Sequence, residues 1–410
     1  MNNNLRARFM AMTADLKTDW EACSKDIPRM SSISEEQRLK QEMLMDQGLQ
    51  KVYQFLNQYH KIPRRSWQKQ RNKLIQLLLD NDTLLVTSHM DHQIKNQLLQ
   101  VSIAFIRAAR EFDPLLSLSD IGQAMRNVWI CAVLQLLFCK EVRYSKAIFG
   151  YSMLYPYTDN LLDDEMLTQA DKQSFNRHFY ARLKGEKICA VNEYEQKVFR
   201  LISAIESVYD RNRYPVVYES LYLIMEGQIQ SLTQQTDSMS QSELLRISIE
   251  KGAASVVADG YLVCGDMDQK QLRFCMQYGF MLQLGDDLQD IEEDHQHHHQ
   301  TLYSMLDENV LLDQPICQLL SYTEQLMNDV TCDAGTKTMV IDNCMLLIYL
   351  SVLSKPHRFS SAFIKRCEQA MPLHYAYLQK IGHVWSNSEL GKRASQDESY
   401  LKELLDAVLE

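Results

Sequence analysis

The chain has 410 residues, a formal net charge of −10 at pH 7, and only 13 Gly and 8 Pro. So few turn-forming residues argue against a turn-rich β architecture, and the frequent Leu, Gln, Met, Lys and Glu predict an all-α fold. The length allows two domains, and one large core is the preferred arrangement. The acidic balance, without an extended run of basic residues, argues against a nucleic-acid partner.

Cysteine usage and apolar runs indicate the compartment. Ten Cys are scattered along the chain without a CxxC pair or zinc-ligand spacing, which is typical of buried thiols in a reducing compartment. The polar N-terminus has no apolar run of signal-peptide length, and the most apolar stretches, 129–138 and 344–353, are each about half as long as a membrane-spanning helix. We therefore expect a cytoplasmic protein with at most peripheral membrane contact.

The first ninety residues contain charged and Gln-rich helical segments with breaks near 31–32, 62–63 and 80–82. We expect residues 1–90 to form an N-terminal helical extension and residues 91–400 to form the main helical domain.

A basic segment within this extension runs from His60 to Arg65 and continues to Lys69 and Arg71. The favoured interpretation is the solvated start of a helix. The alternative is a contact for a diphosphate or for an anionic membrane.

Helices are expected throughout the main domain. Ser117 or Ser119 should cap a long helix that begins near Ile121 and is apolar on nearly all sides, so that it should be central. Pro156 is expected to mark a break after that helix. The expected helices span 92–110, 121–138, 192–210, 216–234, 240–264, 269–293, 310–331, 339–354 and 361–381.

The first of two acidic groups lies in segment 155–163, which reads YPYTDNLLD. On a helix, Asp159 and Asp163 lie about 40° apart, one turn along the same face. Asp164 lies to one side of them, and Glu165 points away. Two carboxylates therefore share one helix face.

The second acidic group is denser and begins in segment 283–290, which reads QLGDDLQD. On a helix, Asp286, Asp290 and Asp294 spread over about 80°, and Asp287 and Glu293 keep five carboxylates within about 120°. Like charges four residues apart destabilise a helix, so this face needs a counter-charge. Magnesium accepts oxygen ligands and usually bridges one or two carboxylates to substrate phosphates, which predicts diphosphate chemistry.

Two other interpretations of the acidic groups stay open. Both could be solvated helix faces, although two such groups, each beside strongly apolar helical sequence, make this less favoured. A di-iron carboxylate bundle would need two Glu-x-x-His pairs, and the chain offers only Glu292 with His295.

These segments resemble the class I isoprenoid synthases. Segment 283–290 is similar to the second motif of trans-prenyl diphosphate synthases, and 159–163 is similar to the Asp-x-x-x-Asp of squalene and phytoene synthases. Segment 155–163 together with 251–262, which reads KGAASVVADGYL, looks most like the bacterial large-terpene synthases, also called class IB. The resemblance covers roughly 121–304.

The resemblance implies a helical bundle around a central apolar cavity, a prenyl diphosphate substrate, and magnesium ions, three with the substrate diphosphate. Lys251, and less strongly Arg246, would contact the diphosphate, while Gly252 could open its helix so that backbone amides help. The implied metal ligands are Asp159, Asp163, Asp286, Asp287, Asp290 and Asp294, and of these Asp159, Asp163, Asp286 and Asp290, with Lys251, are the predicted catalytic residues.

The expected function is that of a terpene synthase. An elongating prenyltransferase would carry paired Arg after its first motif, and Glu165, Met166 and Leu167 stand there instead. The first alternative is nevertheless a prenyltransferase, either chain-elongating or joining two diphosphates head to head. The second is a non-catalytic helical scaffold. Substrate chain length and assembly as a homodimer stay open.

Overall fold

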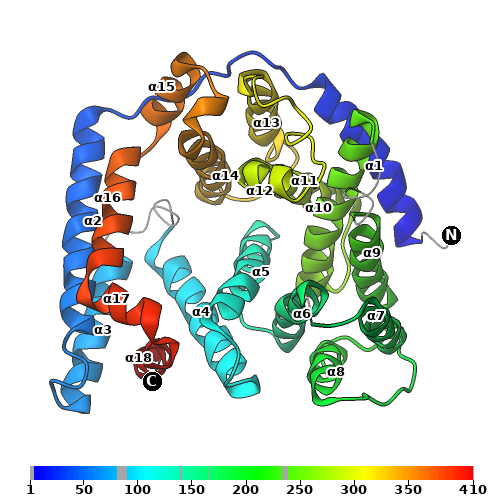
Figure 1. Ribbon diagram of the computed structural model, residues 1–410, viewed down its shortest axis with the longest axis horizontal. Helices are drawn as coiled ribbons and strands as arrows, with labels where there is room; N and C mark the ends of the chain where they lie inside the picture. Colours follow the sequence, from blue (N-terminus) through cyan, green and yellow to red (C-terminus); the bar gives the residue numbers. More distant parts are fainter. Residues whose placement is uncertain are drawn as a thin grey trace. The chain divides into compact units, whose positions relative to one another are not determined.

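The computed structural model describes residues 4–80, 90–138, 141–164, 166–231, 234 and 239–409, apart from the side chains at 162, 163, 229–231, 389 and 394. Every regular element in this part of the chain is a helix, and it contains no strand, which confirms the all-α prediction (Figure 1). The expected bundle around an apolar cavity stays a prediction.

The chain forms two compact units, each built from separate stretches. The first unit comprises Met1–Thr18, Gln97–Gln283 and Asp329–Cys332, and the second comprises Asp19–Asn96, Leu284–Asn328 and Asp333–Glu410. The predicted division near residue 90 stays a prediction.

The first unit contains most of α1 (Leu5–Ala22), α4 (His92–Phe112) and α11 (Gln269–Gln289), and all of α5 (Leu118–Leu137), α6 (Lys146–Asp163), α7 (Gln169–Leu183), α8 (Glu193–Glu206), α9 (Pro215–Ser231) and α10 (Gln241–Cys264). Helix α10 packs against α9, α5 and α6, and α6 packs against α8 and α5. Helix α10 is buried along most of its length from Leu244 to Leu262, so it forms the centre of this unit.

Local capping explains where several of these helices begin. The Ser117 hydroxyl accepts the amide of Asp120, whose side chain in turn accepts the amide of Ser117, and Ser240 forms the same capping box with Glu243. The predicted cap at Ser117 is confirmed, and α5 starts at Leu118, slightly earlier than expected. Its many buried residues confirm that α5 is a core helix.

Helices α10 and α11 cross at two glycines. A Cβ added to Gly252 would overlap the backbone oxygen of Gly279, and a Cβ added to Gly279 would overlap the backbone oxygen of Gly252. The absence of both side chains therefore allows the two backbones to touch.

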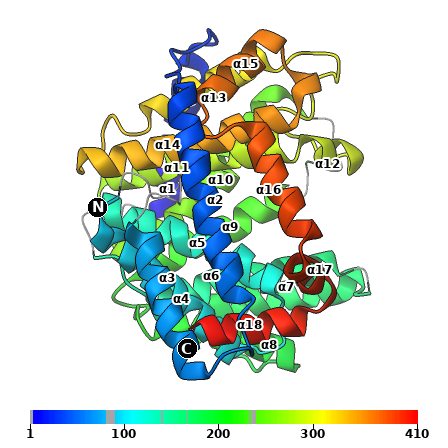
Figure 2. The same cartoon turned by 90° about the vertical axis from the view of Figure 1, so that its left-hand side faces the viewer.

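The second unit contains α2 (Glu35–Leu56), α3 (Arg64–Asp80), α12 (Ile291–Gln296), α13 (Asp313–Gln325), α14 (Ala334–Ser354), η3 (Pro356–Arg358), α15 (Ser361–Ala370), α16 (Tyr375–Asn387), α17 (Glu389–Gln396) and α18 (Glu398–Leu409). Phe55, Trp67, Leu390 and Leu404 form a core cluster that joins α2 and α3 to α17 and α18. Helix α16 runs beside α2, where the Tyr377 hydroxyl donates to the Glu42 carbonyl (Figure 1 and Figure 2).

Several predicted helix boundaries were wrong. The expected helix 310–331 corresponds to the shorter α13, Asp313–Gln325, and the expected helix 339–354 begins earlier, at Ala334. Pro156 lies inside α6 and does not break the chain before the acidic segment, because a proline can remove one amide donor without ending a helix. The expected helix 361–381 ends at Ala370, two residues before Pro372, and α16 begins at Tyr375. The expected helix 269–293 is divided at Asp290 into α11 and α12.

Helix α14 bears on the question of membrane contact. Among the described residues, it is the one helix long and apolar enough to cross a membrane, with a mean hydropathy of 1.4 over the most apolar window, of which 44% is buried. The apolar stretch 344–353 thus belongs to a longer helix than the sequence suggested. Core helices of soluble proteins meet the same criterion, so the cytoplasmic location stays a prediction.

Candidate functional site

The first acidic group lies at the C-terminal end of α6. Most of this helix from Ala147 to Thr158 is buried, although Tyr155 is exposed, whereas Asp159 is half-buried and Asn160 is exposed. The Gln123 amide of α5 donates to Asp159 Oδ2 at 3.3 Å, and the Asn160 amide donates to Asp120 Oδ1 at 3.0 Å. These contacts hold the acidic end of α6 against the start of α5.

The side chain of Asp163 lies outside the described residues, so its proposed pairing with Asp159 stays a prediction. Asp164 follows as the exposed C-cap of α6, with an extended backbone, and its Oδ1 accepts the amide of Met166 at 2.8 Å. Glu165 lies outside the described residues.

A partly buried ion pair that the sequence analysis did not predict anchors this end of α6. Lys197 Nζ lies 2.6 Å from Asp113 Oδ2, and the Tyr157 hydroxyl donates to the same oxygen. Burial would raise the pKa of Asp113, but the hydrogen bonds from Lys197 and Tyr157 outweigh it and lower the pKa below its usual value. Asp113 thus stays charged and ties α6 to α8 and to the end of α4.

A small pocket lies beside the first acidic group. It has a volume of about 40 Å³ and is lined by residues of α6, α7 and α9, among them Tyr151, Tyr155, Thr158, Phe179, Leu221 and Met225. Ligand pockets are commonly some 300–1,000 Å³, so this pocket is far too small to enclose a prenyl chain as it stands. Its walls are mainly aromatic and aliphatic.

The two predicted diphosphate contacts lie on α10. Lys251 is half-buried, and the Arg246 guanidinium lies 2.7 Å from the Glu250 carboxylate, which is almost fully buried. The prediction that Gly252 opens the helix was wrong, because α10 continues unbroken from Gln241 to Cys264. Gly252 instead allows the close crossing with Gly279.

The second acidic group lies where α11 ends and α12 begins. At Asp290 the backbone turns to φ −102° and ψ 9°, which interrupts the regular helix. The amide of Asp290 still donates to the Asp286 carbonyl at 2.9 Å, and the amide of Asp294 donates to the Asp290 carbonyl at 2.8 Å. The one-turn spacing of the three aspartates therefore survives the break.

Exposure differs among these carboxylates. Asp286 and Asp290 are exposed, Asp287 is only 6% exposed, and Asp294 is half-buried and accepts the Thr301 hydroxyl at 3.3 Å. Buried Tyr303 lies near Asp287. Its burial, and to a lesser extent the charge of Asp287, raises the pKa of the Tyr303 phenol well above the usual value.

A lysine that the sequence did not single out meets this group. Lys355, only 7% exposed, donates from Nζ to the Gln289 carbonyl at 2.7 Å, at the C-terminal end of α11. His357 follows, with its Nε2 3.5 Å from Glu292 Oε1. In the sequence, the position of Lys355 between an apolar helix and Pro356 is the feature that could have indicated this contact. A cation at this end of α11 complements both the helix dipole and the acidic side chains.

No protein-family model, curated protein or solved structure matches the chain. The family resemblance therefore depends on the quoted segments alone. Among side chains that the structure describes, no three His, Cys, Asp or Glu gather as ready metal ligands. Magnesium often needs only one or two carboxylates besides phosphate, so the predicted ligands stay predictions.

A further ionisable residue lies inside segment 251–262. Asp259 on α10 is completely buried, its Oδ1 accepts the Cys131 thiol at 3.1 Å, and its Oδ2 has no hydrogen-bond partner among the described residues. Burial raises the pKa of Asp259 to about 8. The core of the first unit therefore holds a carboxyl group that is mostly neutral at pH 7.

Proposed function

We propose that the protein is a terpene synthase that ionises a linear prenyl diphosphate with the help of magnesium and releases diphosphate after cyclisation or deprotonation. One observation carries the proposal: each acidic group stands where a buried helix reaches its exposed end. Buried residues of α6 lead to Asp159, and buried residues of α11 lead to Asp286 and Asp290. Each helix thus joins an apolar interior to clustered carboxylates, the two surroundings that a prenyl diphosphate needs.

The side chains suit magnesium. Asp159, Asp286 and Asp290 offer carboxylate oxygens at helix ends that water can reach, and hard divalent cations prefer such ligands. Bound magnesium would act as a Lewis acid on the departing diphosphate. In this proposal the carboxylates hold the ions, Lys251 adds positive charge near the diphosphate, and the aromatic side chains around Tyr151 and Tyr155 exclude water and stabilise positive charge on carbon.

The decisive experiment is a product analysis. Purified protein with magnesium is incubated with farnesyl, geranylgeranyl and longer prenyl diphosphates, with and without isopentenyl diphosphate, and the products are separated by gas chromatography. A hydrocarbon or alcohol from a single substrate is expected. A longer diphosphate would indicate an elongating prenyltransferase. A hydrocarbon that combines the prenyl chains of two substrate molecules would indicate head-to-head condensation.

A scaffold without catalysis would give no product in this assay. Calorimetry with magnesium and inorganic diphosphate distinguishes a non-catalytic scaffold from an enzyme whose true substrate was not among those tested. A terpene synthase is expected to bind the pair, and failure to bind would contradict the proposal.

A further inference from the structure

Helix α3 concentrates positive charge in an acidic protein. Its 17 residues include Arg64, Arg65, Lys69, Arg71 and Lys73, and its single acidic residue is Asp80 at the last position. With Lys61 in the preceding turn, five exposed basic side chains stand between 61 and 73, at Lys61, Arg64, Arg65, Lys69 and Lys73. The chain as a whole carries a formal charge of −10, so this charge distribution is strongly asymmetric.

The side of α3 opposite these basic residues packs against α2 and α18 of the same unit. Trp67 is 4% exposed and stacks on Phe55 of α2, with ring centroids 3.8 Å apart. Arg71 Nη1 donates to the carbonyl of Val408 in α18 at 3.2 Å. These contacts use the apolar side of α3, so the helix could not insert that side into a bilayer while keeping its packing.

Arg65, Lys69 and Lys73 form the basic face of α3. They recur at every fourth position, so they lie on one side of the helix and repel each other. All three are exposed, and none of them makes an ion pair with another described residue. Such a face is stabilised when an anionic partner supplies the missing counter-charge.

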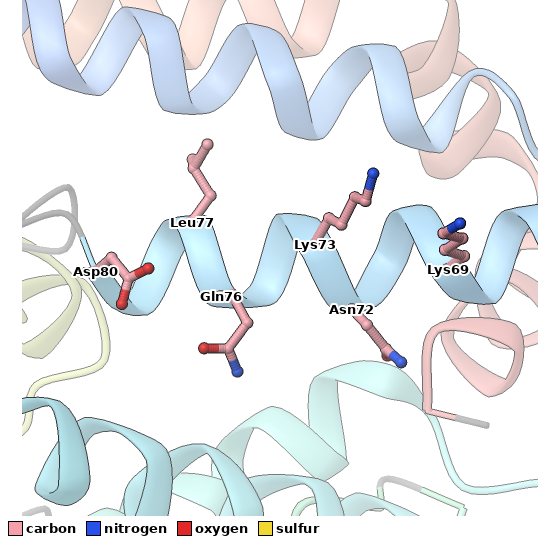
Figure 3. Close-up of a pocket in the computed structure, with 6 residues that line it drawn as sticks. All are labelled: Lys69, Asn72, Lys73, Gln76, Leu77 and Asp80. Carbon is pink, nitrogen blue, oxygen red and sulfur yellow. The ribbon is translucent and has the colours of Figure 1, made fainter.

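A groove along α3 adds polar donors to the basic face. It has a volume of about 560 Å³, and Figure 3 shows its side chains projecting from the helix: Lys69, Asn72, Lys73, Gln76, Leu77 and Asp80. The Asn72 and Gln76 amides can donate hydrogen bonds, as can both ammonium groups. The Asp80 carboxylate marks the far end, so an anion would be held nearer Lys69 and Lys73.

We infer that the basic face of α3 docks onto a membrane surface that carries anionic lipids. Clusters of four to eight Lys or Arg on an amphipathic helix are typical of such contacts, and their attraction is electrostatic, without insertion of the helix. The five exposed basic residues match this number, and the packed apolar side matches surface contact. Nucleic acid is a poorer fit, because its affinity rises with the number of phosphates that basic side chains neutralise, and the chain as a whole carries a formal charge of −10.

Vesicle co-sedimentation of the full chain tests this inference without any need for turnover, so its failure is distinct from failure of the proposed function. The protein should pellet with vesicles of phosphatidylcholine and phosphatidylglycerol, and not with phosphatidylcholine alone. Raising NaCl from about 50 mM to about 500 mM should release it, because salt screens surface charge.

The variant Arg65→Gln/Lys69→Gln/Lys73→Gln should lose about 100-fold in affinity for the anionic vesicles, roughly fivefold for each charge removed. The matched control is Lys25→Gln/Lys187→Gln/Lys365→Gln, which removes the same charge from exposed positions elsewhere. It should bind nearly as the unmodified protein does. Circular dichroism checks that both variants keep their helices.

Three outcomes would overturn the inference. They are equal binding to neutral and anionic vesicles, no binding to anionic vesicles at low salt, and an equal loss in the control variant. Binding to RNA under conditions where vesicles are not bound would assign the basic face to a different partner.

Discussion

At the scale of single residues, Asp259 is a fully buried carboxyl group in the first unit. A fully buried carboxylate without a cation nearby is unfavourable, so the group keeps its proton to a pH near its raised pKa of about 8. In the unfolded chain the same group has a pKa near 3.8. The difference makes the stability of the fold depend on pH.

Between about pH 4 and pH 8 the folded state holds a proton on Asp259 that the unfolded state has lost. The free energy of unfolding should therefore fall as pH rises through this window, by at most about 1.4 kcal/mol per pH unit. In Asp259→Asn this contribution should vanish. Urea unfolding at pH 5.5 and pH 7.5 measures the difference, and parallel pH profiles for both proteins would contradict the assignment.

Asp159 and Asp290 carry the prediction on catalysis. Asp159→Asn and Asp290→Asn should each lower kcat by about 100-fold or more, because an amide holds magnesium more weakly than a carboxylate does. Each variant should keep its helical circular dichroism. Glu308→Gln, which changes an exposed acid outside both groups, is the control and should keep its activity. Full activity in either Asn variant would refute the metal assignment.

At the scale of helices, two contacts position α11, whose C-terminal end carries Asp286. The glycine crossing sets how closely α10 approaches α11, and Lys355 holds the C-terminal end of α11 beside the second acidic group. Neither contact involves the proposed substrate, so both are tested through stability.

Gly252→Ala should lower the free energy of unfolding by about 1–3 kcal/mol, because the new methyl group overlaps the backbone of Gly279 and forces the helices apart. Gly122→Ala on α5 is the matched control, since a Cβ there meets nothing within 4 Å. It should be neutral or stabilise by up to about 1 kcal/mol. Urea unfolding of both variants distinguishes crowding from helix propensity, and equal effects would contradict the crossing.

Lys355→Met should also lower the free energy of unfolding, by about 1–3 kcal/mol. The substitution keeps an apolar stem but leaves the Gln289 carbonyl without its charged donor. Lys365→Gln, at an exposed position, should change stability by less than about 0.5 kcal/mol. A Lys355→Met variant as stable as the unmodified protein would show that water replaces the lysine at no cost.

At the scale of the whole molecule, the two acidic groups belong to different compact units, Asp159 to the first and Asp290 to the second. The proposed function requires both groups to act on one substrate. That requirement concerns energetic coupling, which can be measured without any assumption about how the units are arranged.

A double-mutant cycle measures this coupling. If both groups hold the same magnesium–diphosphate complex, Asp159→Asn/Asp290→Asn should bind inorganic diphosphate with magnesium little worse than either single variant does. Independent sites would give losses that add. Calorimetry on the four proteins measures the difference, and additive losses would separate the two groups functionally.

The sequence by itself determined the helical class and many helix starts, because these depend on neighbouring residues. The local signals include the capping residues Ser117 and Ser240. They also include the apolar residues that recur along α5 and α10. The one-turn spacing of Asp286, Asp290 and Asp294 is another, and it survived a helix break that the sequence did not predict.

Only the tertiary structure decided the features that join distant segments. The contact of Gly252 with Gly279, the approach of Lys355 to Gln289 and the ion pair of Lys197 with Asp113 each connect residues far apart in the chain. Periodicity and capping carry no information about such pairs. Whether a buried carboxyl such as Asp259 is charged also depends on the water that neighbouring helices exclude, which no local pattern records.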